Sequence, residues 1–398
     1  MSSGLSAQRG QVRSEPGGEA RQSLLAFVSR ILLVILLVAA FLFLFKRSTR
    51  LEPELQAVLD GEEEALRAGD WGEFAALLDP DHAPFRQHQK AQFDAVMSAR
   101  RRGESYVGIP YPLHVVEAGR RDDRAWARVS GEGPDGQPFY RVEFFRQLYG
   151  DWLHTGPNPA WWGAEREEHT AHVVWRYREA EEAWITEVAP FMEAAHARAC
   201  ADLGLDPRRS VVTFDLCYSI DCNHVLFYTA GPSISLPAPL LAGWSGETAA
   251  EVLPGIMVGN LLARAMGSGS DPNVSVGNVP AWMDGIRLWE TGRVTGIPGS
   301  EFWLTELRTA AADGSFLSLD AMAYPPTPDT YSLLYAQSYA LVEYLVARHG
   351  PGVLPALVRA AVPSNTPRET IEEAFGPDFD LAAFEQEWMA WMQAEYGQ

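Results

Sequence analysis

Basic residues are scarce in this sequence relative to acidic ones. The 398 residues include 32 Lys and Arg against 52 Asp and Glu, which gives a formal net charge of −20. Seven of the basic residues lie in the first fifty, so the rest of the chain is more acidic still. A body of this charge repels a phosphate backbone, and the sequence has no basic stripe with interleaved aromatic residues. The composition therefore argues against nucleic acid as a partner.

Cysteine is also rare, and several catalytic motifs are missing. The three cysteines do not make a disulfide scaffold. Cys217 and Cys222 could bridge across a tight hairpin, leaving Cys200 free on a helix; three buried free thiols are the alternative. The sequence has no C-x-x-C pair, no Gly-rich phosphate loop and no G-x-S-x-G elbow, so it offers none of these signatures.

One long hydrophobic run lies near the N-terminus. Residues 24–45 are almost wholly apolar and would span roughly 33 Å as a helix, enough to cross a bilayer. Arg30 lies close enough to the start to reach the interface. The run meets Lys46 without a small-x-small cleavage site, which favours a retained anchor over a cleaved signal peptide. We predict a basic tail over residues 1–23, a transmembrane helix over 24–45 in the lipid bilayer, and a single-pass protein whose body is extracytoplasmic.

The hydrophobic period changes within residues 51–163. Helical periodicity runs to about residue 98, and the alternating patterns of strands follow as far as Thr155. Helices followed by a meander of strands indicate an α+β domain. This order, with Ala-Gly-Asp-Trp after the first helix and Asp-Trp-Leu-His-Thr on the last strand, resembles the cone fold of the nuclear transport factor-two-like family. The resemblance implies a cone that holds a small ligand or a catalytic Asp/His pair. Its polar candidates are Asp81, His82, His114 and His154.

Residues 164–398 predict a small sheet followed by a mainly helical bundle. Three segments carry a resemblance: Pro280-Ala-Trp-Met, the run Tyr335–Gly350 that begins Tyr-Ala-Gln-Ser, and the ending Phe384-Glu-Gln-Glu-Trp-Met-Ala-Trp. They resemble the peptidase MA-like family of zinc peptidases, which are gluzincins of the thermolysin type. The resemblance implies an H-E-x-x-H helix that supplies two imidazoles and a general base, and a following helix that supplies a glutamate as the third zinc ligand.

The imidazoles that this chemistry requires are missing. No histidine lies between His224 and His349, where the helix should stand. In the best register, over Glu251–Gly267, the first ligand, the base and the second ligand are replaced by Ile256, Met257 and Asn260.

The third ligand is also displaced. Asp284 lies one position early, and Glu290 lies nearly two helical turns further on. A lone Asn or Asp does not hold zinc at useful affinity. The polar group that also includes Arg287 is more typical of a solvated helix face or an ion pair. We therefore predict a vestigial peptidase site with no catalytic residue and no cofactor, although zinc is expected for the family.

Two other segments contain metal-ligand types. His169 and His172 are three residues apart, but on a strand their side chains point to opposite faces and do not chelate together. Asp221 and His224 lie in a turn with no second cluster nearby in sequence. Neither segment predicts a metal site.

The predicted architecture is thus α+β: a single transmembrane helix, a cone domain over 51–163 and a thermolysin-like domain over 164–398. The favoured hypothesis is a pseudo-metallopeptidase that serves as a binding or scaffold module at the cell envelope, with a peptide or protein partner in its groove. Three alternatives stay open. One is a hydrolase with a non-standard site, another is a ligand-binding or catalytic cone domain, and the third is a purely structural envelope protein.

Overall fold

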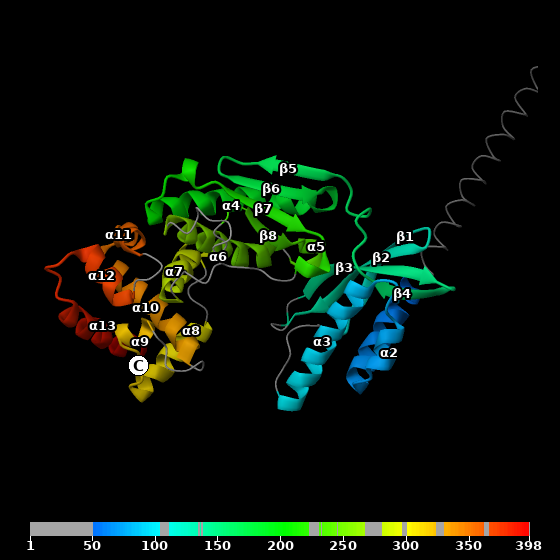
Figure 1. Ribbon diagram of the computed structural model, residues 1–398, viewed down its shortest axis with the longest axis horizontal. Coiled ribbons are helices and arrows are strands. Elements are labelled where there is room, and N and C mark those ends of the chain that lie inside the picture. Colours follow the sequence, from blue (N-terminus) through cyan, green and yellow to red (C-terminus); the bar gives the residue numbers. More distant parts are fainter. Residues whose placement is uncertain are drawn as a thin grey trace, which may run out of the picture.

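The chain folds around two separate four-stranded sheets. In the first the strand order is β1-β2-β3-β4, and in the second it is β5-β6-β7-β8. Figure 1 shows an elongated body with the first sheet toward one end and the C-terminal helices at the other. The computed structural model describes residues 51–103, 111–133, 136, 138–222, 231, 233–244, 246–266, 281–296, 301–323, 330–361 and 366–397.

In the first part of the chain, helices precede an antiparallel meander. Asp70 begins the second helix by accepting hydrogen bonds from the backbone N–H groups of Gly72 and Glu73. Gly103, with a φ of 74°, ends the third helix in the left-handed region that glycine tolerates. The elements are a helix over residues 51–68, α2 (Trp71–Ala76), α3 (Ala83–Arg102), β1 (His114–Arg121), β2 (Arg124–Glu132), β3 (Pro138–Leu148) and β4 (Asp151–Thr155).

The first helix packs on one face of this meander. Leu55 and Leu59 from the helix are buried with Ala127 and Val129 from β2 and Phe145 from β3. Alternate strand residues face the helix because side chains on a strand point to opposite faces in turn. Helices packed on a meander, together with a second sheet and a helical bundle, confirm the predicted α+β class.

The second sheet is mixed. β5 (Glu165–His169) pairs antiparallel with β6 (Val173–Arg178), whereas β6, β7 (Val212–Cys217) and β8 (Ser233–Pro237) run parallel to one another. The sequence predicted that His169 and His172 lie on one strand. The structure instead has a turn at residues 170–172, because the Thr170 hydroxyl and backbone bond to the backbone of Val173.

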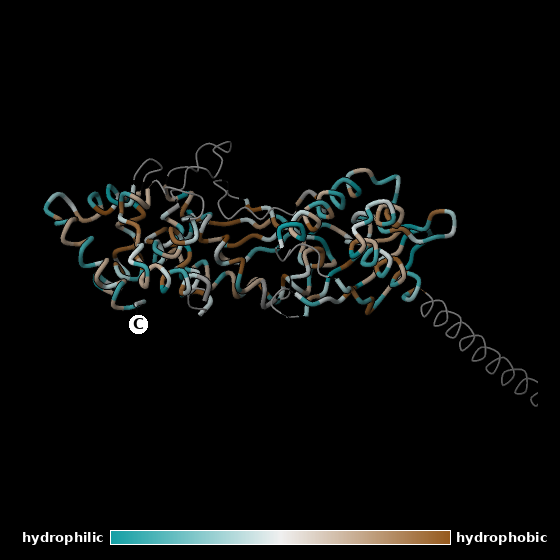
Figure 2. Tube along the Cα trace, turned by 90° about the horizontal axis from the view of Figure 1, so that it is seen from below, coloured by the Kyte–Doolittle hydropathy of each residue, from teal (hydrophilic) through white to brown (hydrophobic). Residues whose placement is uncertain are grey.

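Helices cover this sheet and continue to the end of the chain. Ile185 and Met192 on the first of them pack in one core with Trp175 and Phe214, whose rings stack at 4.6 Å. The strands in the middle of the body are among its most hydrophobic segments (Figure 2). The helices are α4 (Glu182–Leu203), α5 (Pro239–Ala242), α6 (Gly246–Ala265), α7 (Asp284–Thr295), α8 (Glu301–Asp313), α9 (Leu319–Ala323), α10 (Tyr331–His349), α11 (Val353–Ala360), α12 (Pro367–Phe375) and α13 (Leu381–Tyr396).

The two parts meet through an apolar cluster. Val142 and Phe144 on the outer face of β3 are buried with Trp162 and with Ala238, the residue before α5. The indole rings of Trp161 and Trp162 lie edge to face at 4.7 Å in the connecting segment. The predicted division at residues 163 and 164 falls between the two sheets, and it stays a prediction.

The membrane prediction requires correction. No helix among the described parts of residues 51–397 is long and apolar enough to cross a bilayer. The long helices α4 and α6 carry exposed charges such as Glu187 and Glu251 on the faces turned away from the core. The transmembrane helix in the predicted fold class and the single-pass membrane location are therefore wrong for the part of the chain that the structure describes. The segment 24–45 and its contact with lipid lie outside the described residues.

Gly285 sets the distance between α7 and α10. A Cβ added at Gly285 would lie 2.0 Å from the Ser338 carbonyl oxygen, so the helices must separate to admit it. We expect Gly285→Ala to lower the free energy of unfolding by about 1–3 kcal/mol, measured by urea titration. The matched control is Gly255→Ala, also within a helix, where the nearest atoms lie at 3.3 Å on two side chains. Equal stability of the two variants would contradict the close approach.

Candidate functional site

The positions that the sequence register assigned to the H-E-x-x-H motif belong to the hydrophobic core. Ile256 and Met257 on α6 are both 0% exposed and pack in the large cluster of the second part. Asn260, one turn further on, is equally buried, and its Nδ2 donates a hydrogen bond to the Gly231 carbonyl oxygen at 2.8 Å. The asparagine therefore ties α6 to the chain just before β8.

Asp284 stands at the first position of α7 and is paired on its own helix. The Arg287 Nε donates to the Asp284 Oδ1 at 2.6 Å, and both groups are largely buried. Gly255 on α6 makes room for this arginine, since a Cβ there would lie 3.3 Å from an Arg287 terminal nitrogen. Tyr335 from α10 lies near the pair, and its burial and then the Asp284 carboxylate raise its pKa. The helices α6, α7 and α10 thus meet around this ion pair.

Glu290 lies on another side of α7 and faces α4. Burial and then the nearby Asp202 carboxylate raise the pKa of Glu290 to about 8. Arg293 and Arg198 lie close to the same aspartate, with nitrogen-to-oxygen distances of 3.4 Å and 3.9 Å. The structure therefore does not bring Glu290 together with Asp284, and the predicted vestigial set divides between two neighbourhoods.

These side chains do not suit a zinc ion. Ile256 and Met257 offer no nitrogen or oxygen, the Asn260 amide is engaged with a backbone carbonyl, and a guanidinium already neutralises Asp284. A zinc site needs about three such ligands converging on one point. Across the described residues there is also no group of three or more His, Cys, Asp or Glu side chains that could hold a metal ion.

The remaining histidine candidates in the second part have ordinary partners. His169 is exposed and bonds to Glu167 at 2.6 Å. The His172 Nδ1 contacts the Glu193 Oε1 at 2.6 Å, and its ring stacks on His196 at 5.3 Å. His196 and Cys200 are four residues apart, a helical spacing that the sequence prediction overlooked. On α4 the Cys200 Sγ lies 3.7 Å from the His196 Nε2. His224 lies outside the described residues.

Of the four candidates for the cone pocket, the structure buries one. His154 on β4 is 3% exposed and lies inside the first part. Asp81 is exposed and pairs with Arg146 at 2.8 Å. His82 caps α3, where its Nδ1 accepts a hydrogen bond from the backbone N–H of Phe85, and His114 is exposed at the start of β1. The four side chains therefore do not form a common site.

His154 instead joins a buried cluster of charges. Its Nδ1 contacts Glu62 at 2.8 Å and its Nε2 contacts Glu143 at 3.0 Å. The Tyr111 hydroxyl donates to the second oxygen of Glu62 at 2.9 Å, and Arg141 pairs with Glu143 at 2.5 Å. Two carboxylates thus face one imidazolium and one guanidinium, so the cluster is neutral and each acid has a donor.

The pKa values of this cluster show how strongly its members depend on one another. Burial lowers the pKa of His154, but Glu62 and Glu143 together raise it to about 10. Burial raises the pKa of Glu143, but Arg141 and then His154 lower it to about 2. Burial and then Glu62 raise the pKa of Tyr111 well above its usual range. His154 therefore stays charged at neutral pH, which suits a structural ion pair rather than an acid–base catalyst.

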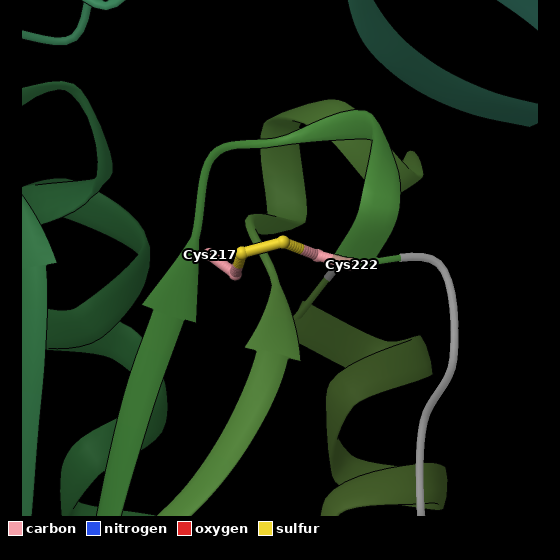
Figure 3. Close-up of a disulfide and its surroundings, with 2 residues drawn as sticks. All are labelled: Cys217 and Cys222. Carbon is pink, nitrogen blue, oxygen red and sulfur yellow. A yellow bond between two sulfur atoms is a disulfide. The ribbon is translucent and has the colours of Figure 1, made fainter. Parts of the chain in front are cut away.

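A small cavity adjoins this cluster at the junction of the two parts. Its volume is about 90 Å³, and Glu143 and His154 line one side while Ile220 and Leu241 from the second part line the other. Ile220 belongs to a short turn that the disulfide between Cys217 and Cys222 closes (Figure 3). The structure thus contains the bridge that the sequence left open, and Cys200 is a buried free thiol.

Comparisons with known proteins bear on the second part of the chain alone. Residues 266–394 match the family model of the Peptidase MA superfamily. The match begins after the segment that the sequence register assigned to H-E-x-x-H, and it runs from before α7 into the last turn of α13. No curated protein and no solved structure matches the chain. The peptidase MA-like interpretation is thereby supported for the C-terminal region, whereas no match supports the resemblance to the nuclear transport factor-two-like family.

Proposed function

We propose that this chain is a peptidase-like protein that binds a peptide or protein segment and does not cleave it. The observation that supports the proposal is the burial of Ile256, Met257 and Asn260, which the sequence register assigns to the H-E-x-x-H positions. In that register, apolar side chains replace the first imidazole and the general base. The Arg287 guanidinium supplies a positive charge beside Asp284.

The remaining frame favours binding over a purely structural role. The region that matches the superfamily extends over the helices from α7 to α13. A peptidase-like helical frame supports backbone and side-chain contacts to a polypeptide, and such contacts need no metal. We therefore assign a peptide or protein segment as the ligand class.

The test combines zinc content with a search for cleavage. Elemental mass spectrometry on the purified full chain is expected to find substoichiometric zinc, because no described set of side chains provides three ligands. Addition of EDTA is expected to leave the unfolding temperature unchanged, since no metal contributes to folding.

A matched pair of variants guards against a trace peptidase contaminant. Asp284→Asn alters the aligned third-ligand region, and Glu251→Gln alters an exposed carboxylate on α6. Neither variant should change the release of fluorescence from a quenched peptide library. Stoichiometric zinc, a melt that EDTA lowers, and cleavage lost only in Asp284→Asn would together overturn the proposal.

A further inference from the structure

A cavity of about 250 Å³ lies on the outer face of the first sheet, away from the helices that pack on its inner face. It is formed where the β1–β2 turn meets the segment that leads to the second part. Its charged and polar lining comes from Arg120, Arg121, Arg124 and Asn158, and its aromatic lining includes Trp126 and Trp161. A pocket with this many cations stands out on a chain of net charge −20.

The arginines are held close together by strand register. Arg121 lies directly opposite Arg124, and Arg124 lies opposite Arg146 on the next strand. Like charges at opposed positions destabilise a sheet unless something neutralises them. Arg146 is neutralised by Asp79, Asp81 and Asp123.

The two outer arginines have no such partner. Within the described residues, neither Arg121 nor Arg124 forms an ion pair, and both are exposed. Asp123 of the turn lies 3.8 Å from Arg146, and neither it nor Asp122 lines the cavity. Arg120 is fixed differently, by hydrogen bonds to the Asp122 carbonyl and to Gln147. Two guanidinium groups therefore remain at the mouth without a counter-ion from the chain.

The aromatic wall is shaped by a glycine. A Cβ at Gly119 would lie 2.4 Å from the Trp126 Nε1, so the bare backbone allows the indole to lie across β1. Trp161 then packs against Trp126 with ring centroids 5.7 Å apart, and against the edge of Phe144 at 5.5 Å. The walls are consequently apolar and flat while the mouth is cationic.

We propose that this cavity binds a small anion that carries an aromatic ring, with a phosphate or carboxylate group at Arg121 and Arg124 and the ring against Trp126 and Trp161. The guanidinium fork matches either oxyanion through paired N–H···O bonds. The indole faces provide contact area for a planar ring. The volume lies just below the range of typical small-molecule sites, which limits the ligand to a single ring with its anion. This site is independent of the peptidase-like region.

The test is calorimetric titration of the full chain with phenyl phosphate, benzoate, inorganic phosphate and benzyl alcohol. We expect saturable binding of phenyl phosphate or benzoate below about 1 mM, and at least tenfold weaker binding of inorganic phosphate and of benzyl alcohol. Preference between the first two probes distinguishes a phosphate ligand from a carboxylate. Binding of inorganic phosphate as tight as that of phenyl phosphate would overturn the aromatic part of the proposal.

Two variants and one control locate the site. Arg124→Gln should weaken binding at least tenfold while preserving the unfolding temperature, since its side chain is exposed. Gly119→Ala should weaken it by displacing Trp126. Arg128→Gln is the matched control, because Arg128 lies on the same face of the same strand but over the Tyr140 ring and outside the cavity. No saturable binding by the parent chain, or an equal loss in the control, would overturn the proposal.

Discussion

Replacement of His154 by alanine is expected to lower the free energy of unfolding by about 3–5 kcal/mol, because it leaves two buried carboxylates without their shared cation. Glu62 is 0% exposed, and its carboxylate is hydrogen-bonded to His154 and Tyr111. Water therefore cannot replace the hydrogen bond that the variant loses. Urea titration of the parent and the variant measures the difference. His114→Ala is the matched control, since His114 is an exposed histidine of the same sheet and should change stability little.

The pH dependence of this effect separates an ion pair from simple packing. The folded pKa of His154 is about 10, above its unfolded value near 6.5. Its contribution to stability is therefore fully present below pH 6.5 and is lost as the pH rises toward 10. The difference between the parent and His154→Ala should be largest at pH 6.5 and smaller at pH 10. A difference that stays constant with pH would show that only packing of the ring was lost.

For the charged cluster, the buried position of Glu62 was predictable from the sequence, whereas its ion-pair partner was not. In the first helix Leu55, Leu59 and Leu66 recur at helical spacing on one face, and Glu62 falls on that face at the same spacing. A carboxylate on an apolar face with no local partner was a signal for a buried ion pair. Its partner was not predictable, since His154 reaches Glu62 only through the pairing of β4 beside β3. Strand register depends on contacts between distant segments, which a single sequence does not specify.

In the vestigial peptidase site, too, the helices were predictable from the sequence but the contacts between them were not. The sequence predicted helices near both α6 and α7, and the structure has them. Asp284 and Arg287 are three residues apart on one helix, a spacing that allows the ion pair that the structure forms. The contact of Gly255 with Arg287 was not predictable, because it depends on how α7 crosses α6. The prediction grouped Asp284 with Glu290, although helical geometry alone argues against one site for both. Six residues turn a helix by about 600°, so these side chains leave α7 about 120° apart. They could not both have faced α6.

Glu290→Gln is expected to stabilise the chain in alkaline solution. Burial and the neighbouring Asp202 carboxylate raise the pKa of Glu290 in the folded chain to about 8, from its ordinary value of 4.5, which applies in the unfolded chain. A raised pKa favours the folded state fully below pH 4.5, and that advantage is lost as the pH rises through 8, where the buried carboxylate must ionise. A glutamine has the same shape and never ionises, so the variant escapes this loss.

The measurement is urea unfolding of the parent and Glu290→Gln at pH 5.5 and pH 8.5. Between these values the advantage of the variant should grow by about 3 kcal/mol, since each pKa unit corresponds to about 1.4 kcal/mol. Glu187→Gln on α4 is the matched control, because Glu187 is exposed and its replacement should not change the pH slope. If instead Glu290→Gln is destabilising at pH 8.5, the carboxylate is ionised in the folded chain and is held by Arg293 and Arg198. Glu290 would then be an ion-pair partner of α4 rather than a neutral acid left in the core between two helices.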